Sequence, residues 1–231
     1  MANDKFERIE KKFWMSAEQY QNLYPILMEH MNIDEYGLSK IRNIYCDTPD
    51  YYLTRRSIEK PKFKEKLRIR SYTEMKADTK VFVEIKRKVD GIGYKRRVSI
   101  PFAEALNLLQ GQTIHSKNPQ IDMELEEFVK RYHPEAKVYL TYERIALYGK
   151  EDPSIRITLD QKIRYALYTP DLDLSQEGKP VLEDESRALM EVKVQGALPQ
   201  WLIHAISSLK IYQVSFSKIG TCFTKHIAKN L

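Results

Sequence analysis

Hydrophobic and polar positions alternate along much of this chain with a period of two, which is the pattern of half-buried β-strands. The segment FKEKLRIRSY, residues 63–72, is the clearest case. Its apolar residues Phe63, Leu67 and Ile69 lie on one side of the predicted strand. The other side carries a row of cations: Lys64, Lys66, Arg68 and Arg70. Further strands are predicted near residues 7–14, 41–46, 80–89, 93–100, 137–148, 154–165 and 188–195.

Segments with helical periodicity lie between these strands. They predict helices at 16–31, 49–60, 102–111 and 118–133 and in the C-terminal region after Pro199. Ser16 and Gln19 have the spacing of a capping box, and DGIG at 90–93 is typical of a hairpin turn. Because no linker interrupts the pattern, residues 1–231 are predicted to form one α+β domain, an antiparallel sheet of about eight strands with flanking helices.

The charged face recurs on several predicted strands. Its members outside segment 63–72 include Arg8, Glu10, Lys12, Glu84, Lys86, Lys88, Lys95, Arg97, Arg156, Asp160, Glu191 and Lys193. Same-face neighbours on a strand lie roughly 6.5–7 Å apart, where two like charges repel by about 0.6 kcal/mol in water. Two interpretations follow: a sheet whose charged side faces water, or a curled sheet whose charged faces surround a cavity that a polyanion stabilises.

The composition favours an anionic partner. Lys and Arg number 38 against 32 Asp and Glu, which gives a net charge of +6. Few aromatic residues interrupt the cationic faces, which argues against single-stranded nucleic acid, whose bases need stacking platforms. Carboxylates at Glu10, Asp160 and Glu191 would oppose phosphate binding unless a divalent metal lay between them and the phosphates. Glu84 is expected to pair with neighbouring cations. The pattern therefore predicts metal-assisted triphosphate or polyphosphate chemistry.

Other features limit the alternatives. Cys46 and Cys222 are far apart in the sequence, which fits a reducing compartment and predicts a cytoplasmic protein. No apolar run approaches the length of a membrane span, so a membrane partner would be a separate polypeptide. The five histidines lack zinc-ligand spacing, and no phosphate-binding P-loop is present.

Motifs in a fixed order resemble those of a known family. They are RIEKKFWM, IYCDTPD, KEKLRIRSY, EIKRKVDGIGYKRR, YLTYERIALYG, IRITLDQKIRY, MEVKV and SFSKIG. Together they resemble the VTC domain, the polyphosphate polymerase branch of the triphosphate tunnel metalloenzymes. The chain is more loosely similar to the CYTH branch, which includes triphosphatases and adenylyl cyclases. Arg8 replaces the first glutamate of the CYTH opening, which favours the VTC branch.

The resemblance implies a closed antiparallel β-barrel, or tunnel, with helices outside. The implied catalytic residues are Arg68, Arg70, Lys86, Arg144, Arg156 and Lys218. The residues expected to bind substrate are Lys12, Lys66, Lys95, Arg97 and Lys193. Glu191 is the implied ligand of Mn²⁺ or Mg²⁺, and Glu10 is a second candidate ligand.

The resemblance also implies an activity: transfer of the γ-phosphoryl group of ATP to a growing polyphosphate chain, with release of ADP. Members of the family often have a second lysine where this chain has Ser215. Two alternatives therefore stay open. One is an inorganic triphosphatase or tripolyphosphatase, in which water is the nucleophile. The other is a module that binds polyphosphate or inositol phosphates without turnover.

Overall fold

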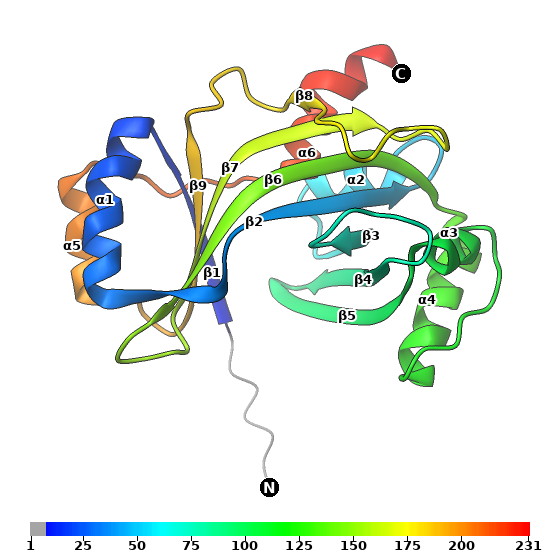
Figure 1. Ribbon diagram of the computed structural model, residues 1–231, viewed down its shortest axis with the longest axis horizontal. Coiled ribbons are helices and arrows are strands. Elements are labelled where there is room, and N and C mark those ends of the chain that lie inside the picture. The colour runs from blue at the N-terminus through cyan, green and yellow to red at the C-terminus, as the bar shows by residue number, and fades with distance from the viewer. Residues whose placement is uncertain (1–7) are drawn as a thin grey trace, which may run out of the picture. The chain divides into compact units, whose positions relative to one another are not determined.

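The computed structural model describes residues 8–231 and has an α+β architecture (Figure 1). The strands are β1 (Arg8–Met15), β2 (Met31–Asp47), β3 (Phe63–Ser71), β4 (Lys80–Val89), β5 (Ile92–Pro101), β6 (Glu135–Gly149), β7 (Arg156–Leu167), β8 (Lys179–Pro180) and β9 (Ala188–Gln195). The helices are α1 (Ala17–His30), α2 (Tyr52–Ile58), α3 (Phe102–Leu109), α4 (Pro119–Tyr132), α5 (Gln200–Ser208) and α6 (Lys218–Cys222). A π-helical turn, Phe223–Ile227, and a 3₁₀ turn, Ala228–Asn230, follow α6.

The strands form one sheet, and its open hydrogen-bonding pattern corrects the expectation of a closed barrel. The order is β1-β9-β7-β6-β2-β3-β4-β5, with β8 paired to β7. Closure would require β1 to exchange backbone hydrogen bonds with β5. Among the described residues, β1 pairs with β9 and β5 pairs with β4, so each of these strands ends the order.

Most predicted strands and helices are confirmed, with two differences. The strand predicted at 41–46 begins ten residues earlier, at Met31, and β8 was not predicted. The sequence of the additional β2 segment, MNIDEYGLSK, contains Asn, Asp and Gly, which are depleted in strands and hide the pattern. Residue 7, the first of the strand predicted at 7–14, lies outside the described residues.

By contacts, the chain divides into two compact units, and β2, β6 and β7 each contribute residues to both. The first unit comprises residues up to Lys40, Tyr142–Ile163 and Leu182–Phe216; the second comprises Ile41–Thr141, Arg164–Val181 and Ser217–Leu231. The formation of a single domain by residues 1–231 stays a prediction. Among the described residues, no helix has the length and apolar character needed to cross a membrane.

In the first unit, α1 and α5 cover one face of β1, β9 and β7. Phe13, Met190 and Ile157 of these strands are buried with Leu27 of α1 and Leu202 of α5. The predicted capping box is present, because Ser16 accepts a hydrogen bond from the Gln19 backbone and the Gln19 side chain accepts one in return. Burial of the apolar face on the helices leaves the charged face of these strands on the opposite side.

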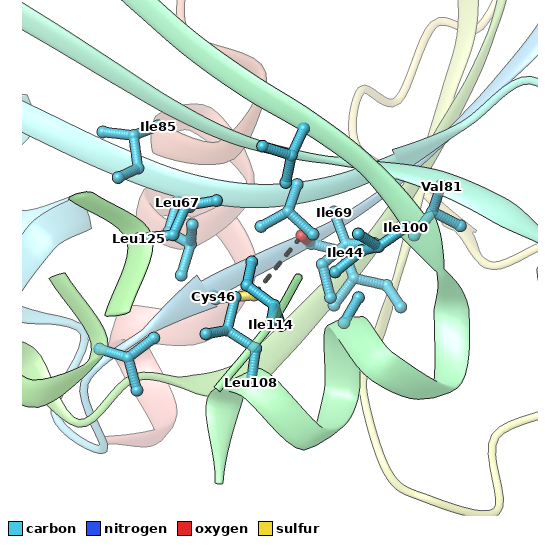
Figure 2. Packing of buried hydrophobic residues seen from close by; sticks show 14 of the residues in the cluster. Ile44, Cys46, Leu67, Ile69, Val81, Ile85, Ile100, Leu108, Ile114 and Leu125 are labelled. Carbon is cyan, nitrogen blue, oxygen red and sulfur yellow. Dashed lines mark hydrogen bonds between the residues drawn. The ribbon is translucent and has the colours of Figure 1, made fainter. Parts of the chain in front are cut away.

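In the second unit, α3 and α4 contribute to a core on the apolar face of β3, β4 and β5. Figure 2 shows part of this core, in which Leu67 and Ile69 of β3 lie with Ile85 of β4 and with Leu108 and Leu125 of the helices. Each of these fully buried side chains contributes about 1.5–3 kcal/mol of hydrophobic stabilisation. The core therefore fixes which side of β3 is apolar and which is cationic.

The turn between β4 and β5 sets the register of the cationic residues. Asp90 and Gly91 both have positive φ, 46° and 93°, as a two-residue type I′ turn requires. Val89 pairs with Ile92 across this turn, so the predicted hairpin is confirmed. Counting back from the turn brings Lys86 opposite Lys95.

Candidate functional site

The second unit presents cross-strand rows of charged residues on the face of its sheet opposite the core. One row joins Tyr45, Arg68, Glu84 and Arg97, and the next joins Lys66, Lys86 and Lys95. Directly opposed residues of an antiparallel pair point to the same side of the sheet, with Cβ atoms ~5 Å apart. The pairing therefore brings together six of the residues predicted from the sequence: Lys66, Arg68, Arg70, Lys86, Lys95 and Arg97.

Glu84 holds two of these cations in place. Its side chain is 1% exposed; Oε2 accepts a hydrogen bond of 2.6 Å from Nε of Arg68, and Oε1 lies 2.6 Å from Nζ of Lys95. Burial alone would raise the pKa of Glu84, but the charges of Arg68 and Arg70 and the contact with Lys95 lower it to about 2. The expected pairing of Glu84 with neighbouring cations is confirmed, and it leaves the guanidinium of Arg68 pre-positioned.

Arg70 and Tyr45 form the inner part of the same face. Arg70 is buried, at 7% exposure, and its Nε donates to Oδ1 of Asn43 at 2.9 Å. Asn43 in turn donates from its amide nitrogen to the Leu140 carbonyl at 3.1 Å. Burial would raise the pKa of Tyr45, yet the charges of Arg68 and Arg70 lower it below its usual value. The charges of Arg68 and Arg70 beside the Tyr45 phenol therefore make the potential at this point positive.

The C-terminal segment contributes to the second unit's site at the start of α6. Nζ of Lys66 donates to Oγ of Ser217 at 3.1 Å, and the same hydroxyl accepts from the Gly220 backbone at 3.2 Å. The next residue, Lys218, is buried at 9% exposure, and its charge also lowers the pKa of Tyr45. Lys218 therefore lies within electrostatic reach of the rows formed by β2 and β3.

The outer members of the rows are more accessible. Lys86, Lys95 and Arg97 are exposed, and the guanidinium of Arg97 lies over the ring of Phe82, 4.6 Å from its centre. Although Lys95 is exposed, partial desolvation and the nearby charges of Arg68 and Arg97 lower its pKa, and its contact with Glu84 partly offsets this effect. The cations of this face thus differ in exposure, from Arg70, which is buried, to Lys86, which is exposed.

The first unit has a charged face of its own, with carboxylates as well as cations. Glu10 pairs with Lys193 and Lys193 with Arg156, and in the neighbouring row Lys12 pairs with Glu191 and Glu191 with Thr158. Arg156 is exposed and lies 5.8 Å from the centre of the Tyr148 ring. The predicted residues therefore fall into two groups, one in each unit.

Lys12 joins the two carboxylates predicted as metal ligands. Its Nζ lies 3.2 Å from Oε1 of Glu10 and 3.6 Å from Oε1 of Glu191, and it donates to the Phe216 carbonyl at 3.1 Å. The two carboxylates therefore share the single positive charge of the Lys12 ammonium group. A second cation can compete for the same oxygens.

Arg144 is fixed by a bidentate ion pair with Asp160. Nε and Nη2 of Arg144 donate to the two Asp160 oxygens at 2.6 and 2.7 Å, and Nη2 is 4.0 Å from Oε2 of Glu191. Although burial alone would lower the pKa of Arg144, nearby Tyr142 and Asp160 raise it well above its usual value. Asp160, which is fully buried, serves here as a partner that orients a cation.

The residues of the first unit fit a metal that is held jointly with phosphate oxygens. Among the described residues, no group of three or more His, Cys, Asp or Glu side chains has the arrangement of a metal site. Mg²⁺ commonly binds through one or two carboxylates together with substrate phosphates, and Glu10 and Glu191 supply two carboxylates. The buried hydroxyl of Thr158, opposite Glu191, has no hydrogen-bond partner within the protein, so it offers a further oxygen.

Several residues of these faces were not predicted as functional from the sequence. Asn43 and Tyr45 lie on β2 beside Arg70 and Arg68, and Ser217 contacts Lys66. Thr158 lies on β7 opposite Glu191. The strand alternation places each of them on a polar face, but only the register between strands reveals which cation each one contacts.

Comparison with known proteins identifies first the class of fold and then the family. The fold is similar to that of a candidate adenylate cyclase from Vibrio parahaemolyticus, with 11% identity, a TM-score of 0.50, and coverage of 93% of this chain and 96% of that one. A protein from Pyrococcus horikoshii OT3 aligns with 13% identity and a TM-score of 0.47, over 95% of this chain and 99% of that one. No protein with a curated description matches the sequence.

The family follows from the sequence model that matches. The VTC domain model covers residues 7–226, nearly the whole chain, and the chain therefore belongs to the VTC domain family. The family predicted from the ordered motifs is confirmed. Together with the cationic faces, this membership defines a domain that handles triphosphate or polyphosphate groups.

Proposed function

We propose that this protein is a metal-dependent polyphosphate polymerase, which transfers the γ-phosphoryl group of ATP to the end of an inorganic polyphosphate chain and releases ADP. The observation that carries the proposal is the cationic face of the second unit, where Arg68 is held by Glu84 and Arg70 by Asn43. Pre-positioned guanidinium groups suit the oxygens of a phosphate chain. Membership of the VTC domain family supports the same reading.

In the proposed reaction, a terminal oxygen of polyphosphate attacks the γ-phosphorus in line. The bond between that phosphorus and the bridging β–γ oxygen breaks, and the electrons of that bond remain on ADP. In the second unit, Arg68 and Arg70 hold the phosphoryl oxygens and stabilise the charge that develops on them. In the first unit, Arg144, which Asp160 orients, is a further cation of the type that stabilises phosphoryl groups. A bound Mn²⁺ or Mg²⁺ would neutralise phosphate charge, with Glu191 and Glu10 as its ligands.

A triphosphatase is the second candidate, and one residue favours it. Ser215 is exposed and uncharged where many VTC domains carry a lysine, so one contact for the growing chain is missing. In this alternative, water attacks the same phosphorus and no chain grows. The polar groups that bind the triphosphate are unchanged.

Incubation with ATP and Mn²⁺ or Mg²⁺ separates the two candidates. Long polyphosphate on gels, with ADP in equal amount, is expected for the polymerase. Free phosphate without chains would overturn it and support the triphosphatase. If the protein binds tripolyphosphate but forms no product, it is a binding module without catalytic activity.

Two neighbouring arginines of β5 provide a matched pair for the site itself. Arg97 lies in the row of Arg68 and Glu84, whereas Arg96 is on the other face, with its Nε 3.4 Å from Glu124. Loss of a charged hydrogen bond costs about 1.5–3 kcal/mol, so Arg97→Ala and Arg70→Ala are expected to weaken tripolyphosphate binding about tenfold or more. Arg96→Ala is expected to leave it unchanged. Equal effects of the two β5 variants would contradict the assigned face.

A further inference from the structure

A cavity of about 460 Å³ lies in the second unit, apart from the rows of cations described above. It is lined by residues of α2, the start of β3 and the end of α4, among them Tyr52, Phe63, Lys64, Glu65 and Tyr132. Its volume lies within the range of small-molecule sites, about 300–1,000 Å³. No part of the proposed phosphoryl transfer uses it.

The walls of this cavity present aromatic surface to solvent. The rings of Tyr52 and Tyr132 are nearly parallel, at 28°, with centres 6.4 Å apart. Tyr52 and Phe63 are 45% and 46% exposed, although both are large apolar side chains. Aromatic rings that remain accessible in a pocket are the usual platforms for a planar base.

A buried carboxylate in the cavity wall, that of Glu65, provides a hydrogen-bond acceptor whose orientation is fixed by its neighbours. Glu65 is 3% exposed; its Oε1 accepts from the Tyr132 hydroxyl at 2.6 Å, and its Oε2 accepts from Nε of Arg87 at 2.9 Å. A carboxylate oxygen has two lone pairs, so each can accept a further hydrogen bond. The exocyclic amine of adenine donates such a bond, whereas the carbonyl at the same position of hypoxanthine does not.

Lys64 connects the cavity to the cationic face. It lines the cavity, donates to the Ser57 carbonyl at 3.3 Å, and pairs with Lys88 in the outermost row of that face. Arg68 lies four residues further along β3, about 13 Å away. Lys64 thus borders both the cavity and the cationic face that carries Arg68, and it marks where a nucleotide with its base in the cavity would reach that face.

We propose that this cavity binds the adenine base of the nucleotide substrate, with Tyr52 as the stacking residue and Glu65 as the acceptor for the exocyclic amine. The inference rests on the proposed function, because it assumes that a nucleotide delivers the triphosphate. It assigns Tyr52 a role in choosing the nucleotide and leaves the grip on the phosphates to the cations of β3.

The test compares a ligand that has a base with one that has none. Titration calorimetry measures the affinities of ATP, ITP and tripolyphosphate for the wild type, Tyr52→Ala and Tyr52→Phe. Loss of one base–aromatic stack is expected to weaken ATP binding by Tyr52→Ala about tenfold, while tripolyphosphate affinity stays unchanged and reports that the variant is folded. Tyr52→Phe retains the ring and is expected to bind ATP as the wild type does. Wild-type protein is expected to bind ITP more weakly than ATP.

The outcomes separate this inference from the proposed function. If the wild type binds neither ATP nor tripolyphosphate, the proposed function itself fails. If it binds both, but Tyr52→Ala weakens both equally or neither, the base site is wrong while the phosphate site stands. Equal affinity for ATP and ITP would overturn the role assigned to Glu65.

Discussion

Glu84→Gln tests the electrostatics of the cationic face most directly. The substitution keeps the shape of a buried side chain and removes the negative charge that contacts Arg68 and Lys95. Glu84 is 1% exposed, so solvent screens its ion pairs little. The variant is expected to have a lower free energy of unfolding at pH 7 than the wild type. Its free energy of unfolding is also expected to fall less between pH 7 and pH 3.

The magnitude follows from the pKa of Glu84. Its fall from 4.5 to about 2 in the folded protein corresponds to about 3 kcal/mol. Because the folded pKa is depressed, this stabilisation is present above pH 4.5 and is lost as pH falls towards 2. The full stabilisation by Glu84 is present at pH 7, and about 1 kcal/mol of it remains at pH 3. Between these pH values the wild type should therefore lose about 2 kcal/mol more stability than Glu84→Gln.

Urea denaturation of both proteins at pH 7, 4 and 3 measures this difference. Glu127→Gln serves as the control, because Glu127 is an exposed glutamate of α4 that lies 4.0 Å from Lys130 and is 68% exposed. The control is expected to follow the wild type at every pH. A stability difference between the wild type and Glu84→Gln that stays constant from pH 7 to pH 3 would refute the reasoning.

Three other predictions concern separate parts of the molecule. Arg144→Ala leaves the buried carboxylate of Asp160 without its bidentate partner and should lower the free energy of unfolding by about 3 kcal/mol, as measured with urea; a loss below about 1 kcal/mol would contradict the pairing. Tripolyphosphate should raise the lowered pKa of Tyr45, visible as the difference between ultraviolet titrations of the wild type and Tyr45→Phe, and an unchanged titration would place the anion elsewhere. Burial raises the pKa of Cys222 to about 12, so thiol reagents should label it only after denaturation.

The alternation of apolar and charged residues made most of the sheet predictable. Leu67 and Ile69 are buried in the core, and Arg68 and Arg70 lie on the other face, as the pattern indicates. Two-residue periodicity is a local property, and burial of one face enforces it. The same holds for the turn at Asp90, whose residue types are those that a type I′ hairpin needs.

Pairing between distant strands was not predictable in this way. The opposition of Glu84 to Arg68 depends on the register of β3 and β4, and the position of Tyr45 depends on β2. A closed barrel came from the resemblance and not from the pattern, since alternation says nothing about which strand lies next to which. For the same reason, the sequence did not reveal the cavity at Tyr52, because its walls come from α2, β3 and α4.

Repulsion between neighbouring lysines on the cationic face destabilises the folded protein, and a bound anion would explain why these residues are present. Lys66 lies opposite Lys86, Lys86 opposite Lys95, and Lys64 opposite Lys88. Like charges directly opposed on a sheet are each destabilising by up to about 1 kcal/mol, and threonine at the same positions would suit a strand better. Glu84 offsets part of the repulsion, but it lies in the neighbouring row beside Arg68. A phosphate chain along β3 would place negative charge between the opposed lysines and so offset their repulsion. A face that only contacts water would lack this stabilising attraction.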